Sequence, residues 1–391
     1  MSKPVVKIAA KPAMSPTGKR SKPSSPKPLV AKSAKPAKPA KPAKPAKPAK
    51  PAKPAKPAKP NIAPAKATSK PKQGVERKTL HPRNLHAHGY DFSALMTSYP
   101  KLKTFVRPTP YGALSIDFAD PIAVKTLNAA LLKHHYGLAF WDIPKGALCP
   151  PIPGRVDYLH YLADLLFEGA PVQRAGQVSA LDIGTGANGV YAILGHQVYG
   201  WQFVASDINP QSLANVQRII DNNPSLQGHL SLRQQQDEKS VFKGIIQASD
   251  RFELTLCNPP FHGSLKEASE GSLRKVRNLQ LNRGEQPKAT SATLNFGGQA
   301  AELWCQGGER QFLATMIRES QAFAEQCLWF TSLVSKQENL KPCYQALAKL
   351  GVDTVKTIEM QQGNKITRVL AWSFHSQAKR LQWRNQIVSG T

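Results

Sequence analysis

The sequence predicts an α/β fold, with helices on both faces of a seven-stranded sheet that is parallel except for an antiparallel hairpin at its end. Three observations predict it. An apolar run at 178–183 leads into the glycine-rich loop 184–189, the strand and loop with which doubly wound sheets often begin. Apolar runs and amphipathic segments then alternate along the chain. Two final runs, at 353–360 and 367–375, are joined by the short turn 361–364, which indicates a hairpin.

The elements of the sheet can be assigned in chain order. Parallel strands are expected near 178–183, 202–206, 230–235, 252–257 and 327–334. After the second strand, Asn209-Pro210 opens a helix whose apolar residues share one face, namely Leu213, Val216, Ile219 and Ile220. A further helix begins near Glu309, and one near 338–350 leads to the hairpin. The hairpin distinguishes this sheet from the six-stranded parallel sheet of dinucleotide-binding proteins.

A helical extension is expected before the sheet, at 78–170. A helix over 121–136 would place Val124, Leu127, Leu131 and Leu132 on one face. The proline-rich connector 149–155 then precedes a second helix over 156–167. Upstream of both, the loop 80–92 is dense in basic and aromatic residues.

The N-terminal tail has a composition that cannot form a core. The first 73 of the 391 residues hold 20 of the 53 lysines and arginines and none of the 25 acidic residues, which leaves a net charge of only +8 on the rest. A Lys-Pro-Ala repeat runs from Lys35 to Pro60, and its proline spacing favours an extended, disordered chain over 1–77. Such a tail is either an electrostatic tether to a polyanion such as ribosomal RNA or a solvated repeat without a specific role.

The cysteine and histidine content predicts neither a disulfide framework nor a metal site. Five cysteines form no C-x-x-C pair (Cys149, Cys257, Cys305, Cys327 and Cys343), as expected for a reducing cytoplasm. His86 and His88 have no further ligands at zinc-finger spacing, so packing or RNA contact is the better interpretation. No apolar run approaches the roughly 20 residues of a membrane span, and the start has no apolar stretch typical of a secretion signal.

The glycine loop carries the first functional signal. Its glycines fit G-x-G-x-x-G, which alone would suggest a dinucleotide site. However, Asp182 precedes Gly184 and Gly186 and would repel a pyrophosphate, whereas a cationic cofactor such as S-adenosylmethionine tolerates or exploits that charge. Asp207 ends the next strand, where a carboxylate can hold ribose hydroxyls in either kind of cofactor.

The second signal is Asn258-Pro259-Pro260-Phe261, at the end of the strand 252–257. The Asn258 side-chain oxygen and the Pro259 carbonyl can both accept from an exocyclic amine, which leaves the nitrogen lone pair free to attack, while Phe261 stacks on the base. The alternative interpretation is a proline turn that closes a strand. Asp182, the glycine loop, Asp207 and this turn together resemble the class I methyltransferases that modify amino groups.

A long polar segment follows, at 262–308. It contains the basic residues Lys266, Arg274, Lys275, Arg277 and Arg283. A loop of this length in a compact domain is usually functional or disordered. Its place directly after the turn favours a substrate loop over a plain surface loop.

Seven motifs, in this order, resemble bacterial 23S ribosomal RNA adenine-N6 methyltransferases and, more distantly, the eukaryotic enzymes that methylate adenine N6 in small nuclear RNA. The motifs are Leu80-His81-Pro82-Arg83-Asn84, Pro150-Pro151-Ile152-Pro153-Gly154-Arg155, Asp182-Ile183-Gly184-Thr185-Gly186, Asn258-Pro259-Pro260-Phe261, Phe296-Gly297-Gly298, Gly307-Gly308-Glu309 and Ala371-Trp372-Ser373-Phe374. The resemblance spans roughly 78–375 and excludes the tail.

The resemblance implies a class I S-adenosylmethionine-dependent methyltransferase domain at 171–380, with substrate loop 262–308, an RNA-binding or cofactor-covering extension at 78–170 and a C-terminal tail at 381–391. It implies that the target base is held by Asn258, Pro259, Pro260 and Phe261. It implies that the cofactor is bound by Arg155, Asp182, Gly184, Gly186, Asp207 and Asn258. Arg155 would hold the methionine carboxylate, although a surface ion pair is the alternative, and Lys336 would contact phosphate or the cofactor pocket. Trp372 is expected in the core.

The expected activity is methyl transfer to N6 of an adenine in 23S ribosomal RNA, free or within a large-subunit assembly intermediate, without metal or membrane. Two alternatives stay open. A glutamine side chain of a ribosome-associated protein presents the same chemical problem, although Phe261 and the basic segments favour nucleic acid. The second alternative is a ribosome assembly factor that has lost catalysis, although the intact glycine loop argues against this alternative.

Overall fold

The computed structural model describes residues 80–168, 178–260, 262–263, 303–362 and 365–389. The tail 1–77, most of the loop 262–308 and the turn at 363–364 therefore lie outside the described residues. The strands are β1 (Val106–Pro108), β2 (Leu114–Ile116), β3 (Ser179–Ile183), β4 (Gln202–Asp207), β5 (Leu230–Gln234), β6 (Phe252–Cys257), β7 (Cys327–Val334), β8 (Thr354–Gln362) and β9 (Lys365–Ser373). The helices are α1 (Phe92–Ser98), α2 (Pro121–Tyr136), α3 (Ile152–Phe167), α4 (Val190–Tyr199), α5 (Pro210–Asp221), α8 (Gly308–Ser320), α9 (Leu340–Lys349) and α10 (Gln377–Ser389).

Four short 3₁₀ turns complete the described elements: η1 (Pro100–Thr104), η2 (Pro224–Leu226), η3 (Gln321–Phe323) and η4 (Gln337–Asn339). None of the described helices is long and apolar enough to cross a membrane.

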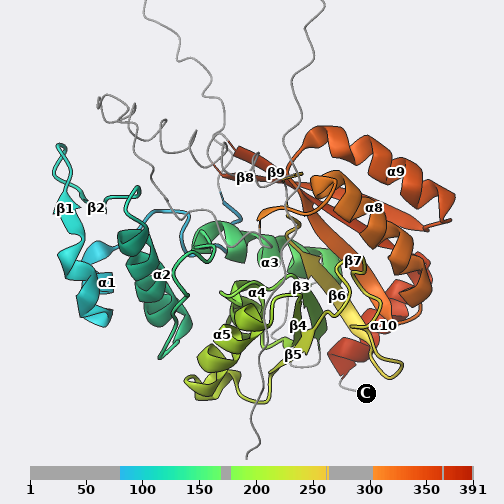
Figure 1. Ribbon diagram of the computed structural model, residues 1–391, viewed down its shortest axis with the longest axis horizontal. Coiled ribbons are helices and arrows are strands. Elements are labelled where there is room, and N and C mark those ends of the chain that lie inside the picture. The colour runs from blue at the N-terminus through green and yellow to red at the C-terminus, as the bar shows by residue number, and fades with distance from the viewer. Residues whose placement is uncertain (1–79, 169–177, 261, 264–302, 363–364, 390–391) are drawn as a thin grey trace, which may run out of the picture. The chain divides into compact units, whose positions relative to one another are not determined.

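The predicted seven-stranded sheet is confirmed, in the order β5-β4-β3-β6-β7-β9-β8 (Figure 1). Strands β3 to β7 pair in parallel, and β9 pairs antiparallel with both β7 and β8. Because the order reverses direction at β3, with β4 on one side and β6 on the other, the carboxyl ends of β3, β4 and β6 border one crevice, the usual ligand site of such sheets.

The two faces of the sheet bury two separate apolar clusters. Side chains alternate along each strand, so Ala180 joins the cluster with α3 and α4, whereas Leu181 joins the cluster with α8 and α9. Trp372, expected in the core, is fully buried in the second cluster, and its indole nitrogen donates to Ser320 Oγ at 3.0 Å. The described cysteines are all free thiols, and Cys257, Cys327 and Cys343 are buried.

The structure differs from the sequence prediction at three places. The helical extension also contains the hairpin of β1 and β2, whose three-residue strands are too short to show a period in the sequence. Helix α3 begins at Ile152, so Arg155 lies in its first turn and not in a connector, because proline is favoured at that end of a helix. Residues expected as a tail from 381 onward belong mostly to α10, which Trp383 anchors by donating to Glu253 Oε1 at 2.9 Å.

Candidate active site at the carboxyl ends of β3, β4 and β6

The glycine loop after β3 is held by the end of β4. The backbone nitrogens of Gly184 and Thr185 both donate to the Ser206 carbonyl at 2.9 Å, and the Gly186 nitrogen donates to Asp207 Oδ2 at 2.8 Å. Gly184 and Gly186 have φ values of 70° and 63°, a conformation that side-chain-bearing residues adopt only with strain. The loop thus keeps its backbone open to a ligand along the crevice.

Asp207 has two roles in this geometry. Its Oδ2 accepts from Gly186 and its Oδ1 accepts from the Asn209 nitrogen at 2.8 Å, so the carboxylate fixes the turns after both β3 and β4. Burial raises the pKa of Asp207, while the backbone hydrogen bonds from Asn209 and Gly186 oppose that rise. A carboxylate has about four acceptor sites, so each oxygen can still accept a ribose hydroxyl.

Asp182 is the most unusual polar group of the site. It is 1% exposed, and neither carboxylate oxygen makes a well-formed hydrogen bond with the described residues, although the Thr185 side chain is close enough to interact with it. Burial raises its pKa to about 7, and the charge of Asp207 adds to the rise, while Thr185 and Arg155 oppose it. A buried carboxylate without a partner is costly unless a cation joins it, which is the chemistry that a methionine ammonium or sulfonium supplies.

Arg155 faces the same region from the first turn of α3. Its Nη1 donates to the Tyr191 hydroxyl at 2.6 Å, and its guanidinium lies 5.3 Å from the centre of the Tyr191 ring. Its Nε is buried and has no partner among the described residues, so it keeps a donor for an incoming anion. The alternative of a surface ion pair is not supported, because no acidic side chain of the described residues pairs with Arg155 at salt-bridge distance.

Two asparagines fix the start of α3. Asn128 Nδ2 donates to the Pro150 carbonyl at 2.6 Å, and Asn84 Nδ2 donates to the Pro153 carbonyl and to Asp157 Oδ1, both at 2.9 Å. Packing or RNA contact was expected for His86 and His88. His86 packs in the core, because it is buried and its Nε2 lies 2.8 Å from the Tyr136 hydroxyl, whereas His88 is exposed.

Asn258 lies beside the glycine loop because of the register of the sheet. Ile183 pairs with Cys257 in the parallel ladder, so Gly184 and Asn258, the next residue of each strand, leave the sheet side by side. Neighbouring strands are about 4.8 Å apart. Asn258 and Pro260 are partly exposed and Pro259 is buried, while Phe261 lies outside the described residues.

A neck follows this turn, formed by His262, Gly263 and the segment 303–308, which the sequence did not reveal. The His262 nitrogen donates to the Leu303 carbonyl at 3.1 Å, and the Cys305 nitrogen donates to the His262 carbonyl at 3.2 Å. At Gly308, where φ is 62°, a Cβ atom would lie 3.1 Å from the Gly263 nitrogen. The chain therefore leaves and returns to the sheet at one point, directly after Pro260.

Glu309 fastens this neck to the end of β7. Its buried carboxylate accepts from the Ser335 nitrogen at 2.7 Å, from the Lys336 nitrogen at 3.1 Å and from Asn339 Nδ2 at 2.6 Å. Lys336 thus lies near the carboxyl end of β7, the strand next to β6. The Gly-Gly-Glu motif therefore supports the turn that carries Asn258.

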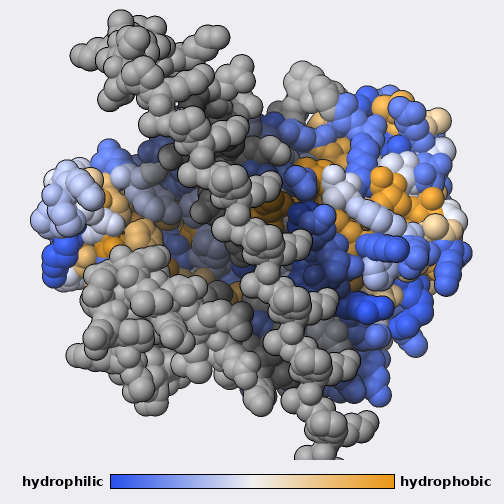
Figure 2. Space-filling model, turned by 90° about the horizontal axis from the view of Figure 1, so that it is seen from above, coloured by the Kyte–Doolittle hydropathy of each residue, from blue (hydrophilic) through white to orange (hydrophobic). Residues whose placement is uncertain are grey.

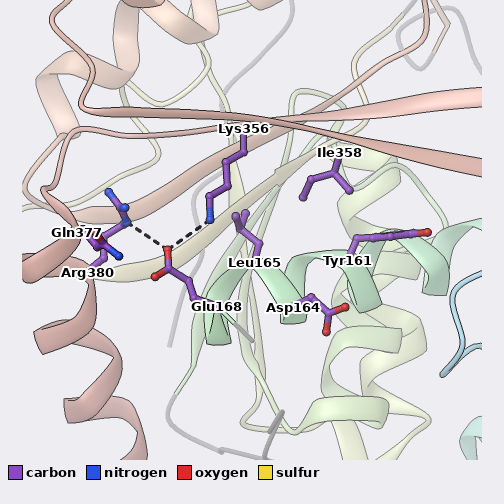
Figure 3. A pocket seen from close by; sticks show the side chains of 8 residues that line it. All are labelled: Tyr161, Asp164, Leu165, Glu168, Lys356, Ile358, Gln377 and Arg380. Atoms are coloured by element: carbon purple, nitrogen blue, oxygen red, sulfur yellow. Dashed lines mark hydrogen bonds and ion pairs between the residues drawn. The ribbon is translucent and has the colours of Figure 1, made fainter. Parts of the chain in front are cut away.

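A cavity of about 560 Å³ lies elsewhere, between the end of α3, β8 and α10 (Figure 3). Its charged side chains are paired: Glu168 Oε1 lies 3.5 Å from Lys356 Nζ and 3.4 Å from Arg380 Nε. Glu168 follows Arg155 by thirteen positions along α3, about 20 Å at 1.5 Å per residue. This cavity is therefore distinct from the crevice at the glycine loop. No group of His, Cys, Asp and Glu that could hold a metal ion occurs among the described residues.

The donor set of the crevice fits S-adenosylmethionine. Asp182 offers an unpartnered carboxylate to a cation, Arg155 offers an unpartnered N–H to a carboxylate, and Asp207 offers acceptors to hydroxyls. The same set does not fit a pyrophosphate, because both carboxylates lie at the glycine loop where its charge would be.

Comparison with known proteins agrees with this geometry. Residues 75–376 match a family described as RNA methyltransferase. The chain is 81% identical over 390 residues to "Ribosomal RNA large subunit methyltransferase F" of Shewanella sp. strain ANA-3, and 74% identical over 392 residues to the protein of that name from Shewanella oneidensis, covering 100% of each chain in both cases.

Solved structures agree as well. The catalytic domain of hMettl16 in complex with MAT2A 3'UTR hairpin 6 has a TM-score of 0.63 and 26% identity, over 77% of this chain and 99% of that one. The N-terminal domain of human METTL16 in complex with SAH has a TM-score of 0.60 and 25% identity, over 76% and 100%. The predicted class I fold and the cofactor, S-adenosylmethionine, are thereby confirmed. The chain belongs to the RNA methyltransferase family and is an S-adenosylmethionine-dependent methyltransferase.

Proposed function

We propose that this protein transfers the methyl group of S-adenosyl-L-methionine to N6 of an adenine in 23S ribosomal RNA. The observation that carries the proposal is the pairing of Ile183 with Cys257, which sets Asn258 beside the glycine loop. The relatives named ribosomal RNA large subunit methyltransferase F support a ribosomal RNA substrate, either free or within a large-subunit assembly intermediate. The hairpin in the hMettl16 complex supports a folded RNA as the form in which the base arrives.

Five residues of the crevice are proposed to bind the cofactor. Arg155, pre-oriented by Tyr191, holds the methionine carboxylate, and Asp182 faces the cationic end of the same moiety. Asp207 accepts from the ribose hydroxyls while it braces Gly186. The open backbone of Gly184 and Gly186 lets the cofactor approach the loop closely. When bound, the cofactor supplies an electrophilic methyl group on a sulfonium.

The target base is proposed to lie on the turn after β6. The Asn258 side-chain oxygen and the Pro259 carbonyl accept from the two N6 hydrogens, and Pro260 and Phe261 hold the face of the ring. Removing the adenine from its stack costs a few kcal/mol, and stacking on protein groups returns about 1–3 kcal/mol. Unstacking costs least in bulges and loops of the RNA, which are therefore the favoured targets.

These contacts prepare the nitrogen for attack. Two acceptors in fixed positions favour a pyramidal amine whose lone pair points toward the crevice. The nitrogen–carbon bond forms as the sulfur–carbon bond breaks, and the methylated amine then loses one proton to water or through Asn258. A strong general base is not needed, because the cationic amine is acidic. Positioning and preorganised acceptors supply the catalysis.

The segment that joins α2 to α3 supports a role for the extension 78–170 in covering the cofactor. Trp141 Nε1 donates to the Asn188 carbonyl at 3.0 Å, and Asn215 Nδ2 donates to the carbonyls of Asp142 and Ala187 at 2.9 and 2.6 Å. Both Ala187 and Asn188 belong to the glycine loop. The extension is therefore fixed directly to the loop that would bind the cofactor.

The proposal is tested with tritiated S-adenosylmethionine and two substrates, deproteinised 23S RNA and large-subunit particles, both from cells that lack this gene. We expect counts that are released by ribonuclease and that co-migrate with N6-methyladenosine after nuclease digestion. Counts released by protease would instead favour the glutamine side chain of a ribosome-associated protein, and would contradict the proposal. Failure of the protein to bind cofactor in calorimetry would contradict any methyltransferase activity.

A further inference from the structure

The hairpin of β1 and β2 presents an aromatic side chain almost completely to solvent. Tyr111 is 96% exposed, at the tip of the turn between the two strands. The turn is closed by hydrogen bonds from the Gly112 nitrogen to the Thr109 carbonyl at 2.9 Å and from the Thr109 nitrogen to the Ala113 carbonyl at 2.7 Å. An aromatic side chain stabilises a protein mainly through the 150–250 Å² that it buries, so a tyrosine this exposed contributes little to the stability of the fold.

The turn is stiff for a loop of its length. Pro110 fixes one backbone torsion, and Gly112 supplies the positive φ, 81°, that closes the turn. The base of the hairpin is anchored, because Val106 and Ile116 pair with each other and are both buried in the main apolar cluster. Tyr111 is therefore held away from the body on a preorganised arm, which lowers the entropy lost when it binds a partner.

The surroundings of the arm are basic. Lys101 and Lys103 on η1 and Arg107 on β1 are exposed, and none of the three forms an ion pair with an acidic side chain of the described residues. The 25 residues 92–116 contain no aspartate or glutamate. The acids at either end, Asp91 and Asp117, accept from the backbone nitrogens of Ala94 at 3.0 Å and Ala119 at 2.7 Å.

The same arm carries apolar area next to the tyrosine. Leu114 on β2, which pairs with Pro108, is 40% exposed. Figure 1 places β1 and β2 at the outer end of the described chain beside α1 and α2, and the same end in Figure 2 shows hydrophobic and hydrophilic surface side by side. An exposed aromatic ring on an arm whose base carries exposed cations is the composition of surfaces that bind unpaired nucleotides.

We infer that the β1–β2 hairpin is an RNA-binding arm, in which Tyr111 stacks on an unpaired base of the substrate RNA while Lys101, Lys103 and Arg107 contact its phosphates. The inference rests on the proposed RNA substrate and adds a second contact point outside the crevice. Any of the four bases can stack on a tyrosine ring, so the arm would position the RNA but would not select which adenine is methylated.

The test compares Tyr111→Ala, Tyr111→Phe and the control Tyr344→Ala, which removes an exposed tyrosine of α9. The full-length protein is titrated with deproteinised, unmethylated 23S RNA, and RNA affinity, KM and kcat are measured. Loss of one stacked base predicts that Tyr111→Ala raises Kd and KM for RNA by roughly 5- to 150-fold with kcat and cofactor affinity unchanged. Tyr111→Phe and Tyr344→Ala should stay within about threefold of the unsubstituted protein.

The cations are tested through salt. The double variant Lys101→Ala/Lys103→Ala should reduce the slope of log Kd against log salt by about two, one for each lost phosphate contact. The inference is overturned if Tyr111→Ala binds RNA and turns it over like the unsubstituted protein. That outcome leaves the proposed activity standing, whereas absence of RNA methylation by the unsubstituted protein would remove the proposed activity itself.

Discussion

Replacing Asp182 by asparagine should stabilise the cofactor-free protein above neutral pH. Asp182 is fully buried near Asp207 and makes no well-formed hydrogen bond with the described residues, and burial raises its pKa from 3.8 to about 7 although the Thr185 side chain opposes the rise. A carboxylic acid with a raised pKa in the folded state binds its proton more tightly there than in the unfolded chain. The free energy of unfolding therefore falls as pH rises from about 4 to 7, and stays lowered above 7.

The size of the effect follows from the two pKa values. About three pKa units at 1.36 kcal/mol each give a cost of about 4 kcal/mol at pH 8, of which about 1.5 kcal/mol is already present at pH 5. Asparagine has nearly the same shape and no charge. Its advantage over aspartate should therefore grow by about 2–3 kcal/mol between pH 5 and pH 8. Any fixed penalty for the unpartnered amide is equal at both pH values and cancels in this comparison.

Urea unfolding of the cofactor-free proteins at pH 5 and pH 8 measures this difference. His86 and His160, whose pKa values burial lowers to about 4 and about 3, titrate equally in both proteins and also cancel. Asp221→Asn, which removes a carboxylate at the exposed end of α5, is the control. An Asp182→Asn advantage that is the same at both pH values would refute the reasoning. Although the substitution should stabilise the cofactor-free protein at pH 8, it should weaken cofactor binding, which calorimetry measures.

Two further predictions concern the supports of the site. Tyr191→Phe removes the hydroxyl that accepts from Arg155 Nη1 at 2.6 Å, so cofactor Kd should rise about fivefold (about 1 kcal/mol) with RNA affinity unchanged. The control Tyr136→Phe, which removes the hydroxyl beside His86, should not affect cofactor binding. An unchanged cofactor Kd for Tyr191→Phe would contradict the role of Arg155. Gly308→Ala should lower the free energy of unfolding by about 1–3 kcal/mol more than Gly351→Ala and should reduce methylation. Both glycines have positive φ, but only Gly308 abuts Gly263, and equal losses in urea unfolding would show that the neck is not tightly packed.

The sheet and the crevice could be predicted because local sequence encodes them. Strand alternation, the glycine spacing and Asn258-Pro259 depend on neighbouring residues, and the register then brings Asn258 to Gly184 without further information. The environment of Arg155 could not be predicted in this way. Its partner Tyr191 is 36 residues away, and the asparagines that fix its helix are also distant in sequence.

The neck and the hairpin arm escaped prediction for different reasons. The neck joins His262 to Leu303 and Cys305 across a long polar segment, and a single parallel bridge has no periodic signal. In the arm, three-residue strands are too short for alternation to be read. Helix α10 was mistaken for a tail because its residues are mostly polar, and its anchors, such as Trp383 on Glu253, lie far along the chain.

The proposed activity depends on Asn258 holding an adenine N6 beside the cofactor. This contact is tested by comparing Asn258→Ala with the unsubstituted protein in single-turnover methylation of 23S RNA and in calorimetric binding of S-adenosylhomocysteine. We expect methylation to fall by about 100-fold or more while cofactor Kd stays within about threefold. Methylation by Asn258→Ala at the unsubstituted rate would show that Asn258 does not hold the target amine.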